Sequence, residues 1–142
     1  MSDNNATFVC QVSVAWGEMD ALAHVNNVAY FRYFETARIA FFEKYYPLEQ
    51  LYRAGCGPVI SENQARYKRA VTYPDTLSIS VSVSKVHSDR FTLEYEIFSD
   101  NQQAVTTTGS SVAVMFDFRQ QRKADMPEDL YKLLKNIQQI EP

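Results

Sequence analysis

One long segment without a continuous polar side constrains the fold of this chain more than any other. Residues Asn27 to Tyr45 favour a helix, which Pro47 ends because proline cannot continue a helix. Its apolar residues are spread nearly all round the helix: Val28, Ala29, Tyr30, Phe31, Tyr33, Phe34, Ala37, Ile39, Ala40, Phe41 and Phe42. A helix that is apolar on most sides is buried on most sides. The rest of the chain must therefore fold around it.

The segments outside this helix carry the two-residue period of β-strands. The clearest is 76–84, in which Leu77, Ile79, Val81 and Val83 alternate with four serines. Similar patterns predict four further strands, at about 7–16, 59–71, 91–97 and 104–118. A short helix is expected over 125–137, because Asp125 and Glu128 have the spacing of a capping box.

Short connections join these predicted strands. Turn-forming residues stand at 55–58, 73–75, 87–89 and 99–101. Connections this tight join antiparallel neighbours. The sequence therefore predicts an α+β fold, in which an antiparallel sheet of about five strands curls around one long buried helix and a short C-terminal helix follows.

Length and composition limit the class of protein. With 142 residues, of which 46% are apolar, the chain is long enough to form a single domain over 1–142 with its own core. A net charge of −3 without a basic stripe argues against nucleic acid as a partner. Cys10 and Cys56 are far apart and lack metal-ligand spacing, so no metal is expected. No leader pattern or membrane-spanning run is found, and we expect a soluble cytoplasmic protein.

Chemistry-bearing residues gather between the first predicted strand and the long helix. Asp20, His24, Asn26 and Asn27 fall within eight residues. The asparagine pair lies at the expected helix N-terminus, where an asparagine is a good cap and where free N–H groups attract an oxyanion. A base or nucleophile beside an oxyanion site is the minimum requirement for acyl transfer.

This segment also resembles a known family. The run from Asp20 to Tyr30, continued to Arg38, resembles the signature of the hot-dog-fold thioesterases, in particular of the 4-hydroxybenzoyl-CoA thioesterase-like branch. The resemblance implies a hot-dog fold and cofactor-independent hydrolysis of acyl-coenzyme A. It also implies assembly as a homodimer or homotetramer, with active sites at the seam between subunits.

The same residues leave two other functions open. His24-Val25-Asn26-Asn27 also resembles the His-Val-Asn-Asn run of the acyl-acyl-carrier-protein thioesterases. Hot-dog domains further include acyl-CoA-binding regulators without catalysis, and a fold alone does not settle a function. An intact Asp20 argues against a purely binding role.

The resemblance also implies roles for single residues. The Asp20 carboxylate would attack the thioester carbonyl or activate water, and the Asn27 backbone N–H would polarise that carbonyl. Leu22 stands where the carrier-protein enzymes have an asparagine, which leaves His24 either catalytic or structural.

Four residues are candidates for binding the substrate. Asn26 and Tyr30 stand beside the expected catalytic groups, although Asn26 can equally serve as the helix cap and Tyr30 can belong to the core. Arg66 and Lys68 share a face of the predicted second strand, where they would contact the phosphates of coenzyme A or act as a solvated strand edge.

Overall fold

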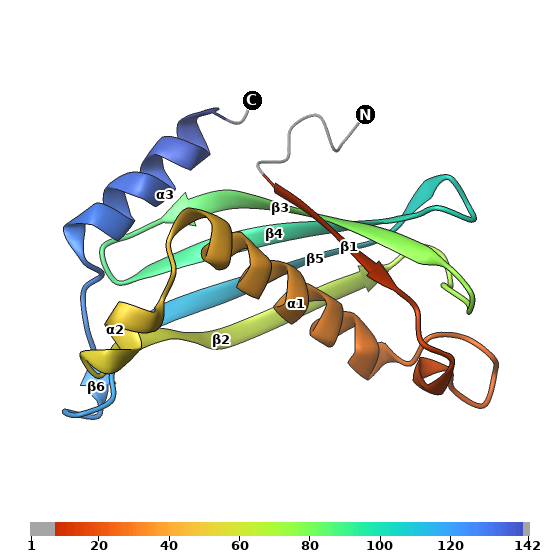
Figure 1. Cartoon of the computed structure of the whole chain (residues 1–142), viewed down its shortest axis with the longest axis horizontal. Coiled ribbons are helices and arrows are strands. Elements are labelled where there is room, and N and C mark those ends of the chain that lie inside the picture. The colour runs from red at the N-terminus through yellow and green to blue at the C-terminus, as the bar shows by residue number, and fades with distance from the viewer. Residues whose placement is uncertain (1–7, 141–142) are drawn as a thin grey trace.

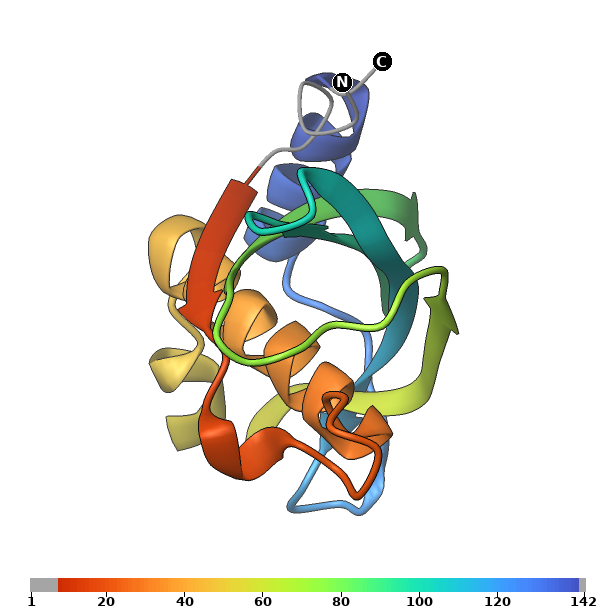
Figure 2. The ribbon, with the colours of Figure 1, turned by 90° about the vertical axis from the view of Figure 1, so that its right-hand side faces the viewer.

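The computed structural model describes residues 8–140, and it consists of an antiparallel sheet curled around one long helix (Figures 1 and 2). The helix is α1 (Asn27–Tyr45). The strands are β1 (Phe8–Ser13), β2 (Cys56–Tyr67), β3 (Thr76–Val86), β4 (Arg90–Ser99), β5 (Ala104–Asp117) and the short β6 (Arg122–Lys123). Their order in the sheet is β1-β3-β4-β5-β2, and β6 pairs with β5. The predicted hot-dog architecture is confirmed.

The core lies between α1 and the concave face of the sheet. Phe34 of α1 is fully buried and stacks on Tyr95 of β4, with ring centroids 4.4 Å apart. Gly109 of β5 permits this packing, because a Cβ at that position would lie 2.5 Å from the Phe34 ring. The strand residues that face α1 include the predicted alternating set Leu77, Ile79, Val81 and Val83, all of them buried.

One stripe of α1 remains uncovered. Val28 and Ile39 are eleven residues apart, which places them on the same side of the helix, and they are 64% and 56% exposed. Arg32 and Glu35 lie between them on this side and are also exposed. The prediction that α1 is buried on most sides is therefore correct, but it does not hold for this stripe.

Strand β2 differs most from its prediction. It begins at Cys56, inside the expected turn at 55–58, and it ends at Tyr67 rather than near residue 71. Proline at position 58 is tolerated because β2 is an edge strand of the sheet. A Cβ on Gly57 would lie 2.4 Å from the Tyr52 ring, so the ring packs directly on this glycine within the strand.

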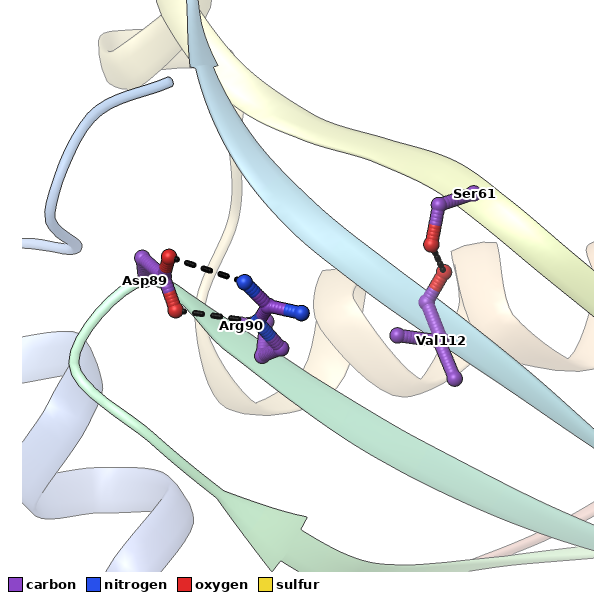
Figure 3. Close-up of polar contacts among 4 residues, drawn as sticks. All are labelled: Ser61, Asp89, Arg90 and Val112. Carbon is purple, nitrogen blue, oxygen red and sulfur yellow. Dashed lines mark hydrogen bonds and ion pairs between the residues drawn. The ribbon is translucent and has the colours of Figure 1, made fainter.

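A bulge bends β2 near its middle. The register with β5 shifts between Ile60 and Glu62, and the Ser61 hydroxyl donates to the Val112 carbonyl at 3.3 Å (Figure 3). At the start of β4, Arg90 donates twice to the Asp89 carboxylate, at 3.0 and 3.2 Å (Figure 3). Arg90 consequently holds the pKa of Asp89 below its usual range.

Two helices complete the described part of the chain. α2 (Glu49–Arg53) was not predicted, because five residues are too few to show a helical period. α3 (Glu128–Ile140) packs on β3 and buries Leu130, Leu134 and Ile137. It begins at Glu128, so the predicted capping pair with Asp125 is wrong. No helix within residues 8–140 is long and apolar enough to cross a membrane.

Candidate active site

Residues 19–26, which we call the Asp20 loop, form a small closed unit between the 3-10 helix η2 (Trp16–Glu18) and α1. Met19 and Val25 pair as a single antiparallel bridge. The Asp20 N–H donates to the His24 carbonyl at 2.7 Å. Val25 is 3% exposed, and its N–H donates to the Val71 carbonyl at 2.8 Å. A buried valine thus anchors a loop whose polar residues remain exposed.

The Asp20 carboxylate has one oxygen engaged and one free. Its Oδ1 accepts the backbone N–H groups of Leu22 at 2.9 Å and His24 at 3.2 Å. Its Oδ2 has no hydrogen-bond partner within residues 8–140. The loop therefore fixes the orientation of the carboxylate while leaving one oxygen accessible to a substrate or a water molecule.

The N-terminus of α1 presents one free donor beside this carboxylate. Asn26 is the N-cap: its Oδ1 accepts the Val28 N–H at 3.0 Å, and its carbonyl accepts the Ala29 N–H at 2.9 Å. The Asn27 N–H, by contrast, finds no acceptor in the part of the chain that the structure describes. Because a helix N-terminus carries partial positive charge, this amide is suited to an oxyanion.

One hollow of about 260 Å³ brings the predicted residues together. Its walls come from the Asp20 loop, the first turn of α1 and the segment after β2: Asp20, His24, Val25, Asn27, Tyr30, Tyr67, Lys68, Arg69 and Ala70. We call it the Asp20 pocket. Asn26 is not among these residues, since its side chain is used in the cap.

The aromatic wall of the pocket combines a predicted residue with one that was missed. Tyr30 is 3% exposed, and its ring packs edge-to-face with the Tyr67 ring, with centroids 4.8 Å apart. Burial raises the pKa of both phenols, so each stays neutral at ordinary pH. Tyr67 stands at the last position of β2, some 40 residues away in sequence from Tyr30, and no local pattern links the two.

The two predicted basic residues do not share a face. Because β2 ends at Tyr67, Lys68 leaves the strand and lines the Asp20 pocket. Arg66 is still within β2, opposite Thr108, and lines a separate hollow on the outer face of the sheet with Glu94 and Glu96. Arg69, the third basic residue of this segment, lies in the pocket beside Lys68.

No group of three or more His, Cys, Asp or Glu side chains within residues 8–140 is placed to hold a metal ion. Cys10 and Cys56 are both half-buried free thiols, and burial raises the pKa of Cys10. Neither cysteine lies in the Asp20 pocket.

Comparison with known proteins places the chain in a family. The model of the thioesterase-like superfamily matches residues 14–134, and the chain belongs to this superfamily. Its architecture is the hot-dog fold, which it shares with solved thioesterase structures.

The chain is also similar to individual proteins. YsmA of Bacillus subtilis is 36% identical over 89 residues, which cover 63% of this chain and only 59% of YsmA. The DHNA-CoA thioesterase of Staphylococcus aureus has a TM-score of 0.86 at 19% identity, covering 93% of this chain and 91% of that one. A second S. aureus protein, solved in complex with CoA, also gives 0.86, at 13% identity and with 95% and 85% covered. At these identities the structural matches show the shared fold.

Proposed function

We propose that this protein is an acyl-CoA thioesterase, which hydrolyses the thioester of an acyl-coenzyme A to a free carboxylate and CoA. The observation that carries the proposal is the pairing of two groups in the Asp20 pocket. The Asp20 carboxylate has a free Oδ2, and the Asn27 backbone N–H has no acceptor within residues 8–140. Thioester hydrolysis needs an oxygen nucleophile or base next to a donor for the carbonyl oxygen.

The proposed chemistry follows two routes that share one donor. Asp20 Oδ2 either attacks the carbonyl carbon or takes a proton from a water molecule that attacks it. Both routes place negative charge on the carbonyl oxygen, and the Asn27 N–H stabilises that charge. Collapse breaks the C–S bond, and the sulfur leaves as CoA thiolate and takes up a proton. When water attacks directly, its oxygen becomes the second carboxylate oxygen of the product. When Asp20 attacks, collapse leaves an anhydride between Asp20 and the acyl group, and a water molecule then hydrolyses this anhydride to the product acid and the free Asp20 carboxylate.

The basic residues and the histidine complete the proposed site. Lys68 and Arg69 are exposed at the pocket, where charged hydrogen bonds to the phosphates of coenzyme A are available. The S. aureus relative in complex with CoA supports a CoA-linked substrate. His24 donates its backbone N–H to Asp20 Oδ1 and so helps to shape the loop, and His24 also lines the pocket.

We also propose that the protein is at least a homodimer, with a homotetramer as the doubled form. β2 is an edge strand whose residues 61–64 are all exposed, and an open edge favours pairing with another strand. The uncovered stripe of α1 supplies further apolar surface at Val28 and Ile39. Light scattering at micromolar concentration should give at least twice the chain mass of 16.3 kDa. A mass of one chain would contradict this.

The proposed activity is tested by measuring thiol release from a panel of aromatic and aliphatic acyl-CoA substrates, with the same acyl groups on acyl carrier protein in parallel. We expect turnover of the CoA thioesters. Turnover of the carrier-protein thioesters alone would favour the acyl-acyl-carrier-protein function. Tight binding of acyl-CoA without any thiol release would identify a binding module and contradict the proposal.

A further inference from the structure

Glu18 lies where three separate segments meet, immediately before the Asp20 loop. Its Oε1 accepts the Ala15 backbone N–H at 2.8 Å, in the segment that follows β1. The same oxygen accepts the Tyr33 hydroxyl of α1 at 2.7 Å. Its backbone carbonyl accepts the N–H of Asn26, the N-cap of α1, at 2.8 Å. One residue therefore links the end of the β1 segment to both the cap and the body of α1.

The bond between Glu18 and Tyr33 is held in a protected environment. The Tyr33 side chain is only 4% exposed, and Glu18 is half-buried. Burial, followed by the hydrogen bond to Glu18, raises the pKa of Tyr33 far above its usual value. The phenol consequently stays protonated, and its O–H donates a hydrogen bond to the Glu18 carboxylate. Hydrogen bonds to a charged acceptor are shorter and stronger than neutral ones.

This bond attaches the base of the Asp20 loop to the body of α1. Only Met19 separates Glu18 from Asp20, and the Met19–Val25 bridge closes the loop at its base. The loop therefore moves with its base, which Glu18 attaches to α1. The Asn27 N–H belongs to α1 itself, so the same attachment sets the position of the carboxylate relative to this amide.

We infer that Glu18, acting through Tyr33, is a positioning residue of this site. The inference rests on the proposed function, because the relative position of Asp20 and the Asn27 N–H matters only if both act on one substrate. Glu18 is not among the residues that line the Asp20 pocket. Its role is to fix the position of the Asp20 carboxylate relative to the Asn27 N–H. Small displacements of reacting groups reduce turnover strongly while leaving substrate binding intact.

The first test is a kinetic comparison of two tyrosine variants. Tyr33→Phe removes the hydroxyl and keeps the ring, and we expect kcat to fall roughly tenfold with KM within about twofold of wild type. Tyr46→Phe is the matched control, because the Tyr46 hydroxyl also donates to a carboxylate, Asp129 Oδ1 at 2.9 Å, away from the pocket. We expect its kcat to equal that of wild type.

Variants of Glu18 separate positioning from simple loss of packing. Glu18→Gln keeps an oxygen that can accept the Tyr33 hydroxyl and the Ala15 N–H, whereas Glu18→Ala removes it. We expect Glu18→Gln to retain most of the turnover that Glu18→Ala loses. Equal losses in both variants would contradict the inference.

A second readout does not depend on activity. The Leu22 and His24 amides donate to Asp20 Oδ1, so their hydrogen exchange reports the order of the loop. Tyr33→Phe should accelerate this exchange at least about tenfold, and Tyr46→Phe should not. The inference is overturned if Tyr33→Phe leaves either kcat or the exchange at the wild-type value. If the wild-type protein releases no thiol, the proposed function fails, and the exchange alone decides whether Tyr33 holds the loop.

Discussion

A tyrosine near each end of α1 donates its hydroxyl to a carboxylate outside the helix: Tyr33 in the N-terminal half and Tyr46 at the C-cap. In the N-terminal half Tyr33 bonds to Glu18 at 2.7 Å, and at the C-terminal end Tyr46 bonds to Asp129 at 2.9 Å. The second bond connects two helices, α1 and α3. The first connects α1 to the end of η2, directly before the Asp20 loop and its exposed carboxylate. The same interaction therefore joins two helices at one end of α1 and, in our proposal, orders the Asp20 carboxylate at the other.

The N-terminal end also differs in the state of its backbone amides. The Asn26 side chain satisfies the Val28 N–H, and its carbonyl satisfies the Ala29 N–H. The Asn27 N–H is left without an acceptor within the described residues, directly beside the Asp20 pocket. An uncompensated donor at a helix start is a common feature, but here its residue lines a hollow that Asp20 also lines.

The largest expected effect comes from removing that donor. Proline is tolerated at the first position of a helix, and Asn26 already has the extended backbone that precedes proline, with φ −66° and ψ 142°. Asn27→Pro should therefore preserve α1 while lowering kcat about 10²–10³-fold, the value of one oxyanion donor. Asn27→Ala keeps the N–H and is the control, with turnover close to wild type. Steady-state thiol release measures both, and equal activity in the two variants would contradict a backbone donor.

A smaller effect is expected at His24. If its backbone N–H only holds Asp20, then His24→Ala keeps that N–H and should lower kcat less than about tenfold, which is under about 1.4 kcal/mol of barrier. A pH–rate profile of the wild-type protein sharpens this result. A fall in rate as the pH drops through a histidine-like value near 6.5, together with a deep loss in His24→Ala, would identify the imidazole as a general base.

The smallest effect concerns stability at high pH, where the two halves of α1 should behave alike. Burial and the bond to Asp129 raise the pKa of Tyr46 to about 12 from an ordinary 10.0. The unfolded chain therefore loses this proton near pH 10 while the folded chain keeps it, so the free energy of unfolding should fall as the pH rises from 10 towards 12. The pKa of Tyr33 is raised in the same direction.

Replacing either tyrosine by phenylalanine removes one contribution to this decline. Urea unfolding at pH 9 and pH 11 should show a weaker dependence on pH in both variants than in wild type. An unchanged dependence would mean that neither phenol titrates differently in the folded chain. If the expected result is found, Tyr33→Phe and Tyr46→Phe have a similar effect on the pH dependence of unfolding but differ in kcat. The difference in kcat then isolates the role of Tyr33.

The sequence was sufficient where a pattern is local. Leu77 to Val83 alternate without interruption, and the run from Asp20 to Asn27 contains the candidate catalytic residues close together. It was insufficient at β2, where Gly57 and Pro58 indicated a turn. The reasons for a strand there are tertiary: the Tyr52 ring packs on Gly57, and the edge position tolerates proline.

The sequence predicted the part of the candidate site that lies within residues 20–30, together with Lys68, but not the rest of the part that comes from the end of β2. Tyr67 and Arg69 reach the pocket because the end of β2 lies beside the N-terminus of α1. No sequence pattern near Asp20 predicts that these two residues belong to the site. Arg66 was placed with Lys68 because the strand was expected to continue past residue 67. The Glu18–Tyr33 bond joins residues 15 apart in sequence across an irregular loop. Hydrophobic periodicity cannot predict a polar contact of this kind.

The central claim is that the Asp20 carboxylate performs the chemistry beside the Asn27 N–H. Its most direct test is the rate of thiol release by Asp20→Asn on the best acyl-CoA substrate, with circular dichroism as the check of folding. Asparagine keeps an oxygen that can accept the Leu22 and His24 amides, so the loop should persist while the charge is lost. The account predicts a native spectrum and a kcat at least about 10²-fold lower. Turnover close to wild type would remove Asp20 from the mechanism.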